Sequence, residues 1–241
     1  MKTCFIILLA VSTAALAQEA GWNFQGGFRG LFQGKVVTNE PYSGVGVSTS
    51  KRTLSDGNTI NESNCVKVYR DSAGRTRREE TPNSAACSAT PQSIFISDPV
   101  AGVEYVINLQ AKTYRQFTIT VPTAATTSQA RTRAANPNEV EMSLGTQAVS
   151  GTSFSAQGTQ TVRTIPAGRF GNGQPITTTS VRWFSPDLQI VTQSLRTDPR
   201  NGTTTYQLSD ISTAEPAASL FELPSGLTLE QGHGPRGRRV P

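Results

Sequence analysis

The sequence predicts a mainly β protein: an antiparallel sheet built of hairpins, with few short helices. From residue 35 onward β-branched residues and threonine are abundant, and clusters of turn residues interrupt them at short, regular intervals. Several segments also alternate apolar and polar residues, as Val103, Tyr105, Ile107 and Leu109 do. Hydrophobic residues make up 36% of the chain, which is enough for a sheet with one buried face.

Residues 1–17 have the pattern of an export signal. Lys2 precedes a short apolar run, and the small residues Ala15 and Ala17 predict cleavage between Ala17 and Gln18. The run is shorter than the ~20 apolar residues of a membrane-spanning helix. No cysteine follows the cleavage site, so a lipid anchor is not expected. We expect a mature chain without an integral membrane segment, either periplasmic or secreted.

Composition divides the remaining chain into four parts. Residues 18–34 form a lead-in rich in glycine and aromatic residues, and residues 35–223 a single β domain. Its halves, 35–121 and 139–223, are joined by a small, polar, proline-bracketed loop at 122–138. Residues 224–241 are rich in Gly, Pro and Arg, which predicts a flexible basic tail.

The stretch YRDSAGRTRREE, residues 69–80, predicts a tight hairpin. Asp71 and Gly74 suit the first and last positions of a type I turn, with Gly74 left-handed. In that register Tyr69 faces Arg77, Val68 faces Arg78, Asp71 faces Arg75 and Lys67 faces Glu79. Opposite charges then pair across a ribbon that we expect to be exposed to solvent.

Two other interpretations of this stretch, a phosphate site and a catalytic carboxylate pair, are less favoured than the hairpin. A phosphate site would need backbone amides converging at a helix start, and no helix follows. Glu79 and Glu80 are adjacent on a strand and point to opposite faces, so they cannot act as a carboxylate pair.

Two cysteines remain after the signal. Cys65 and Cys87 are 22 residues apart, which in an exported protein predicts one disulfide. Two buried free thiols are the alternative. No metal site is expected, because His233 is the sole histidine and no CxxC pair exists.

Turns and strands repeat along the chain. DPVAG at 98–102 and DPRNG at 198–202 predict turns between strands. Further strands are expected at SIFIS, ITTTSVRWFS, QIVTQSLRT and TTTYQLSDI. Residues 213–224 predict one short helical turn that buries Leu220 and Phe221.

The chain lacks the usual signs of catalysis. Its histidine lies in the tail, the GxSxG and HExxH motifs are absent, and the aspartates fall mainly in turns. The glycine-rich GRFGNG, 168–173, has no helix behind it and predicts a surface loop. The net charge of +5 is mild. We expect a non-enzymatic protein that has no cofactor and binds no nucleic acid.

The order and spacing of several stretches resemble a family of uncharacterised exported proteins from acidobacteria. These stretches are YRDSAGRTRREE, DPVAGVEYVINLQAK, MSLGTQAVSG, TIPAGRFGNGQPI, VRWFSPDLQ, TDPRNGTTTYQLSDI and EPAASLFELPSG. They cover most of residues 66–226. The resemblance implies membership but no function.

A looser resemblance is to the periplasmic lipoprotein carriers. It rests on strands joined by short turns, the hairpin at Trp183–Leu188 and the closing segment Ser219–Pro224. It implies a curved antiparallel sheet or half-barrel whose concave face holds acyl chains. The carriers open with an amphipathic helix after the signal, whereas four glycines make residues 18–34 a poor helix. The analogy supports a fold more than a function.

The predicted function is therefore binding of a hydrophobic or lipidated ligand, a lipid or a lipidated protein, on the concave face. Plain core packing is the alternative for each candidate lining residue; these are Tyr105, Ile107, Phe117, Ile119, Trp183 and Leu195. Two other functions remain open. One is an envelope structural or interaction protein without a pocket. The other is a carbohydrate-binding surface, which would need Trp22, Tyr42 or Trp183 exposed and coplanar. The oligomeric state is not predicted.

Overall fold

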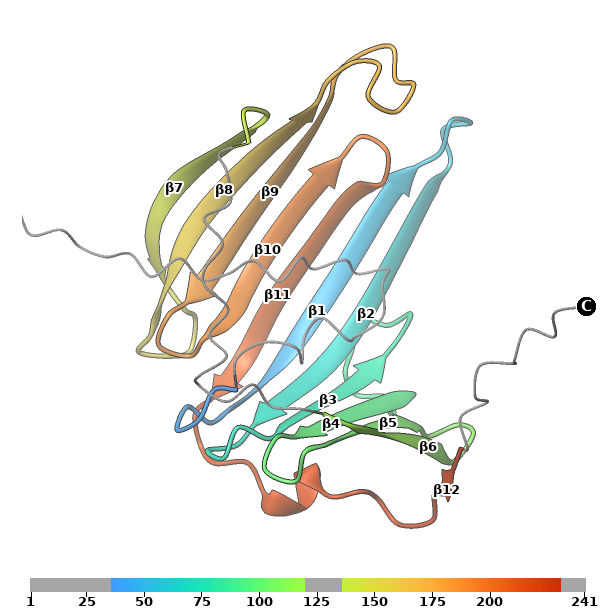
Figure 1. Ribbon diagram of the computed structural model, residues 1–241, viewed down its shortest axis with the longest axis vertical. Helices are drawn as coiled ribbons and strands as arrows, with labels where there is room; N and C mark the ends of the chain where they lie inside the picture. Colours follow the sequence, from blue (N-terminus) through green and yellow to red (C-terminus); the bar gives the residue numbers. More distant parts are fainter. Residues whose placement is uncertain (1–35, 120–135, 231–241) are drawn as a thin grey trace, which may run out of the picture.

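A computed structural model describes residues 36–119 and 136–230, and in these residues twelve strands form one sheet (Figure 1). The first group comprises β1 (Tyr42–Thr53), β2 (Thr59–Arg70), β3 (Thr76–Thr81), β4 (Ser93–Asp98), β5 (Val103–Asn108) and β6 (Thr113–Thr118). The second comprises β7 (Glu139–Ala148), β8 (Ser155–Ile165), β9 (Ile176–Ser185), β10 (Ile190–Asp198) and β11 (Gly202–Ser212). A short 3-10 helix, η2 (Ala218–Phe221), and β12 (Thr228–Leu229) follow.

Two meanders meet in the middle of the sheet. The strand order is β12-β6-β5-β4-β3-β2-β1-β11-β10-β9-β8-β7, and every pair is antiparallel except β12 with β6. The chain thus runs from the centre to one edge, resumes at the opposite edge with β7 and returns to the centre. The predicted signal, lead-in and most of the tail lie outside the described residues, so the predicted domain boundaries remain predictions.

The sheet is bent rather than flat. The short strands β3–β6 turn out of the plane of the long strands, and η2 lies beneath them on the outside of the bend (Figure 1). Side chains alternate between the two faces of a strand, and directly opposed residues share a face. The face that carries η2 is called the outer face below, and the other is the inner face. The predicted class, a mainly β curved antiparallel sheet, is confirmed.

Glycines allow side chains to close over β1 on the inner face. A Cβ at Gly46 would lie 2.7 Å from the Tyr206 ring and 2.8 Å from a methyl group of Val66. A Cβ at Gly44 would lie 3.1 Å from Leu208. Side chains of β11 and β2 therefore occupy the space that β1 leaves empty, which is the positional use of strand glycines.

The outer face of the short strands carries one of the two hydrophobic cores. Ile94, Ile96 and Ile107 pack there against Phe221 of η2, and all four side chains are buried. The predicted helical turn is thus present and buries Phe221. Arg77 also reaches this segment, since its Nη1 donates a hydrogen bond of 2.9 Å to the Leu220 carbonyl.

The predicted hairpin forms, but it is not solvated. The register pairs Tyr69 with Arg77 and Val68 with Arg78, and Gly74 has φ +83°. However, β1 flanks β2 and β4 flanks β3, so both strands are interior. Arg77 and Arg78 are each only 9% exposed. The expectation of an exposed ribbon was wrong because local charge pairing does not reveal which strands flank the hairpin.

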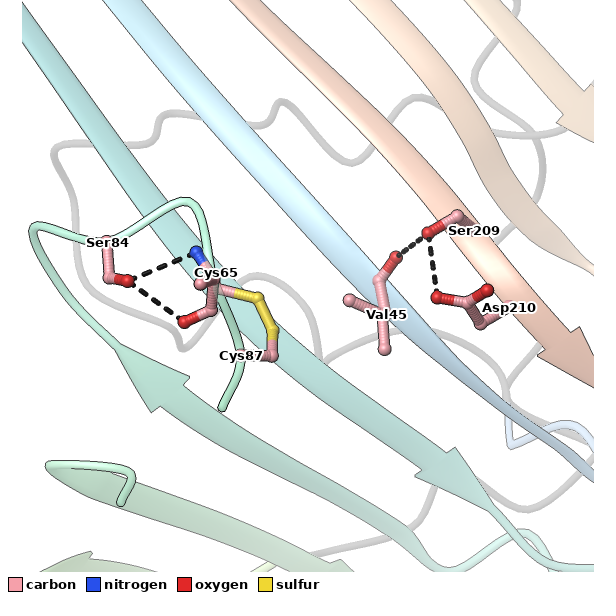
Figure 2. Close-up of a disulfide and its surroundings, with 7 residues drawn as sticks. Val45, Cys65, Ser84, Cys87, Ser209 and Asp210 are labelled. Atoms are coloured by element: carbon pink, nitrogen blue, oxygen red, sulfur yellow. Dashed lines mark hydrogen bonds between the residues drawn. A yellow bond between two sulfur atoms is a disulfide. The ribbon is translucent and has the colours of Figure 1, made fainter. Parts of the chain in front are cut away.

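The predicted disulfide between Cys65 and Cys87 is present (Figure 2). The two Cα atoms are 5.4 Å apart, a usual separation for a disulfide. Cys65 is fully buried in β2, and Cys87 lies in the loop between β3 and β4. The bond therefore ties that loop back onto the sheet.

Candidate functional site

A row of inner-face side chains crosses the short strands at the bend. The register places Val68, Arg78, Phe95 and Val106 directly opposite one another on β2, β3, β4 and β5. Leu208 and Tyr206 of β11 reach the same face over the two glycines of β1. The inner-face site, as named below, consists of Tyr42, Val66, Val68, Arg78, Glu80, Phe95, Val106, Phe117, Tyr206 and Leu208.

A partly buried ion pair lies within this site. Arg78 Nη2 is 2.9 Å from Glu80 Oε1, and the two residues lie on the same face of β3. Burial lowers the pKa of Arg78 and raises the pKa of Glu80, while the attraction between them opposes both shifts. The pair adds hydrogen-bonding groups to the apolar and aromatic side chains of the site without adding net charge. Two more charged residues border the site on the same face, since Arg115 faces Val106 and Glu104 faces Phe117.

Two tyrosines frame the site and remain neutral phenols. Burial is the main cause that raises the pKa values of Tyr206 and Tyr42. The Arg70 guanidinium lies 4.7 Å from the centre of the Tyr42 ring. Arg70 also donates hydrogen bonds to the carbonyls of Glu40, at 2.8 Å, and Leu188, at 2.6 Å. Arg70 therefore fixes the lower end of the site to the turn between β9 and β10.

The charged groups of the site, Arg78 and Glu80, are engaged with each other, and burial raises the pKa values of its two tyrosines. In the described residues no group of three His, Cys, Asp or Glu side chains could hold a metal ion. Within the same ranges, no helix is long and apolar enough to cross a membrane.

The structure places the six candidate lining residues in different surroundings. Tyr105 and Ile107 lie on the outer face beneath η2, where Ile107 is fully buried in the core. Phe117 lies on the inner face, opposite Glu104. Ile119 follows the end of β6, and its N–H bonds the Gly102 carbonyl at 2.9 Å. The six residues are therefore not brought together on one face.

Trp183 and Leu195 do belong together, on the outer face of the long strands. The outer strip, as named below, is a row of apolar residues on β7–β10 formed by Val140, Met142, Leu144, Val162, Val181, Trp183 and Leu195. Val140 is 57% exposed, Met142 46%, and Leu144 and Leu195 each 39%. The Trp183 ring covers Gly158, where a Cβ would lie 2.6 Å from the ring and 2.9 Å from Leu144.

The sequence did contain a signal for the inner-face residues that were missed. Ile94, Phe95 and Ile96 form a continuous apolar run, which is typical of a strand that has both faces covered or functional. The alternation of apolar residues along β5 predicts Tyr105 and Ile107 as lining residues and leaves out Val106. The proposed aromatic platform does not form from Tyr42 and Trp183, because neither ring is exposed: both are partly buried against a hydrophobic core. Trp22 lies outside the described residues.

Comparison with known proteins gives similarity in shape only. No family model and no curated protein matches the chain. A chain of the Pseudomonas aeruginosa MucA/MucB complex has a TM-score of 0.43 and 11% identity, over 80% of this chain and 59% of that chain. A LolA superfamily protein from Nitrosomonas europaea has a TM-score of 0.32 and 7% identity, over 78% of this chain and 92% of that chain. This chain thus spans less than two thirds of the first neighbour. Membership of the acidobacterial family remains a prediction.

Proposed function

We propose that this protein is an exported, non-enzymatic protein of the cell envelope that binds a hydrophobic or lipidated ligand on the inner face of its sheet. The observation that carries the proposal is the inner-face site, where apolar and aromatic side chains from both meanders surround one neutralised ion pair. The proposal replaces the six candidate lining residues with the inner-face site, of which Phe117 is the shared member.

The composition of the site fits an amphipathic ligand. Burial of acyl chain against Val68, Phe95 and Val106 would contribute about 0.8 kcal/mol for each CH₂ group removed from water. Arg78 and Glu80 offer donors and acceptors to an amide or ester group, as the few placed polar groups of ligand sites do. An apolar chain with a polar linkage therefore suits the site better than a charged solute.

The disulfide supports the proposed location. Cys65–Cys87 would form and persist in an oxidising compartment such as the periplasm or the extracellular space. The predicted cleavage after Ala17 gives the same location from a separate part of the chain.

Native mass spectrometry tests the proposal. The mature chain is purified from a periplasm without detergent, and lipids are extracted from the same sample. We expect a stoichiometric adduct that leaves as a lipid or lipopeptide. Val106→Asp, on the inner face, is expected to abolish the adduct, whereas the matched outer-face variant Leu195→Asp keeps it. A bare mass for the unmodified chain, or equal loss in both variants, would contradict inner-face binding.

A second candidate function is an interaction protein without a ligand. The outer strip favours it, because contiguous exposed apolar residues often mark protein contacts. A bare mass together with a partner that protects Met142 from oxidation would support this candidate.

A further inference from the structure

We propose that β7 pairs with β7 of a second copy of this chain, antiparallel, about a two-fold axis at Met142. The result is a closed dimer in which one sheet continues across both copies. This proposal is independent of ligand binding on the inner face.

The two edges of the sheet differ in whether a further segment covers the outermost strand of the meander. At one edge, β12 pairs with β6, and Glu230 accepts hydrogen bonds from the Thr113 hydroxyl and from Arg115, each at 2.6 Å. At the other edge β7 pairs only with β8 among the described strands, which leaves one side of a ten-residue strand open. An open edge presents unpaired N–H and C=O groups to another strand.

The side chains of β7 favour association over protection of this edge. Val140 and Met142 point to the outer face and are 57% and 46% exposed. Strand β7 contains neither lysine nor proline, the residues that commonly blunt an edge. Its one irregularity is a bulge between Ser143 and Gly145, in which Leu144 has no partner on β8. Residues 139–143 therefore form the regular edge, and Leu144 lies at its end.

The sequence of this segment is self-complementary with the axis at Met142. With Met142 on the axis, Val140 faces Leu144 of the second copy, and Glu141 faces Ser143. Apolar residues then meet on the outer face, and no like charges are directly opposed. Shifting the axis to Glu141 would place two glutamates opposite each other, which is destabilising. The commitment to a second copy of this chain rests on this complementarity.

The pairing would close after two copies. A two-fold interface uses the same strand in both chains, so the β7 edge of each copy is used up by the other copy. At the far edge, β12 covers Thr113 and Tyr114 of β6. The proposal therefore predicts a dimer and no larger assembly.

Cysteine cross-linking tests the register. In the chain from Gln18 onward, Met142→Cys is expected to form an intermolecular disulfide under mild oxidation, because the two copies of residue 142 face each other within disulfide range. Val140→Cys is the matched control on the same strand and face. Its two copies would lie about 13 Å apart, four residues along the strand, and should not cross-link.

Sedimentation equilibrium tests the energetics without a cross-link. We expect the unmodified chain to dimerise. Met142→Lys should weaken the dimer by at least about tenfold, since two ammonium groups would meet at the axis. Ser143→Lys should tighten it about fivefold, because each lysine would face Glu141 of the other copy. Phe170→Ser, at an exposed loop tip far from β7 in sequence, should change nothing.

Circular dichroism of each variant verifies the fold, which these exposed positions should leave intact. A chain that stays monomeric at every concentration, equal cross-linking of both cysteine variants, or growth into larger oligomers would each overturn the proposal. The proposal would also be overturned if β7 bound an unrelated extended peptide while the chain showed no self-association.

Discussion

Gly46 controls how closely β11 and β2 approach each other over β1. Its missing side chain leaves room for the Tyr206 ring and for Val66, so both lie over β1 on the inner face. Glycine in a strand interior ordinarily weakens the strand. Here the close approach of neighbouring side chains explains its presence, and left-handed backbone geometry is not involved.

Gly46→Ala should therefore destabilise the protein by about 1 to 3 kcal/mol, the usual range for overpacking. Denaturant unfolding measures the change in the free energy of unfolding. Gly173→Ala is the matched control, because a Cβ there meets nothing within 4 Å. Equal stability of the two variants would show that the inner face tolerates a wider separation than the structure has.

Asp198 gives the fold a defined response to acid. It is 1% exposed, and its carboxylate accepts hydrogen bonds from the backbone N–H and the guanidinium of Arg200. The hydrogen bond from the Arg200 side chain is the main cause that lowers the pKa of Asp198 from 3.8 to about 2. The folded state therefore favours the charged carboxylate.

Stability from this group should be fully present above about pH 4 and should be lost as the pH falls to about 2. Asp198→Asn keeps an acceptor oxygen but removes the charge. The variant should be about 1 to 2 kcal/mol less stable at pH 7, a range that allows for the half-exposed Arg200. The gap should shrink as unfolding is measured at lower pH. A gap that is constant with pH would exclude the charge as its cause.

At the scale of elements, turns were predictable because their determinants are local. Asp71 and Gly74 specified the β2–β3 turn, and Asp98 caps its own turn by accepting from the N–H groups of Val100 and Ala101. The burial of the hairpin was not predictable, because it depends on β1 and β4 as neighbours. From the sequence, Arg77 and Arg78 are expected at the surface. In the structure they lie on β3, between β2 and β4, and are buried.

The loop between β3 and β4 depends on its disulfide. Cys65–Cys87 closes a loop of 22 residues, which contributes about 3 kcal/mol in the chain-entropy model. Replacing both cysteines by serine should lower the free energy of unfolding by that amount. Amide hydrogen exchange should rise in residues 82–92 more than in β9 and β10. Uniform faster exchange would instead mean that the bond stabilises the sheet as a whole.

At the scale of the whole molecule, the pairing of β1 with β11 defines the fold. It joins residues more than 150 positions apart, for example Ser48 and Tyr206. The sequence contains strand patterns but no local signal for this pairing, so the half-barrel had to be inferred from a resemblance. Strand patterns also do not say which residues of separate strands share a face. The sequence therefore predicts Tyr105 and Phe117 on one face, whereas they lie on opposite faces of the sheet.

The molecule thus has two faces with different surfaces. The inner face combines aromatic and apolar side chains with ion pairs that include Arg78–Glu80, and the outer face is covered by η2 at one end and carries the outer strip at the other. We propose that the hydrophobic ligand binds on the inner face.

Photolabelling with a diazirine-bearing fatty acid tests this proposed binding face. The mature chain is labelled, digested and analysed by mass spectrometry for the modified residues. We predict saturable labelling of peptides that contain Val68, Phe95 or Val106, which an unlabelled acyl chain displaces. Labelling confined to peptides that contain Met142, Trp183 or Leu195 would contradict the claim and assign binding to the outer strip.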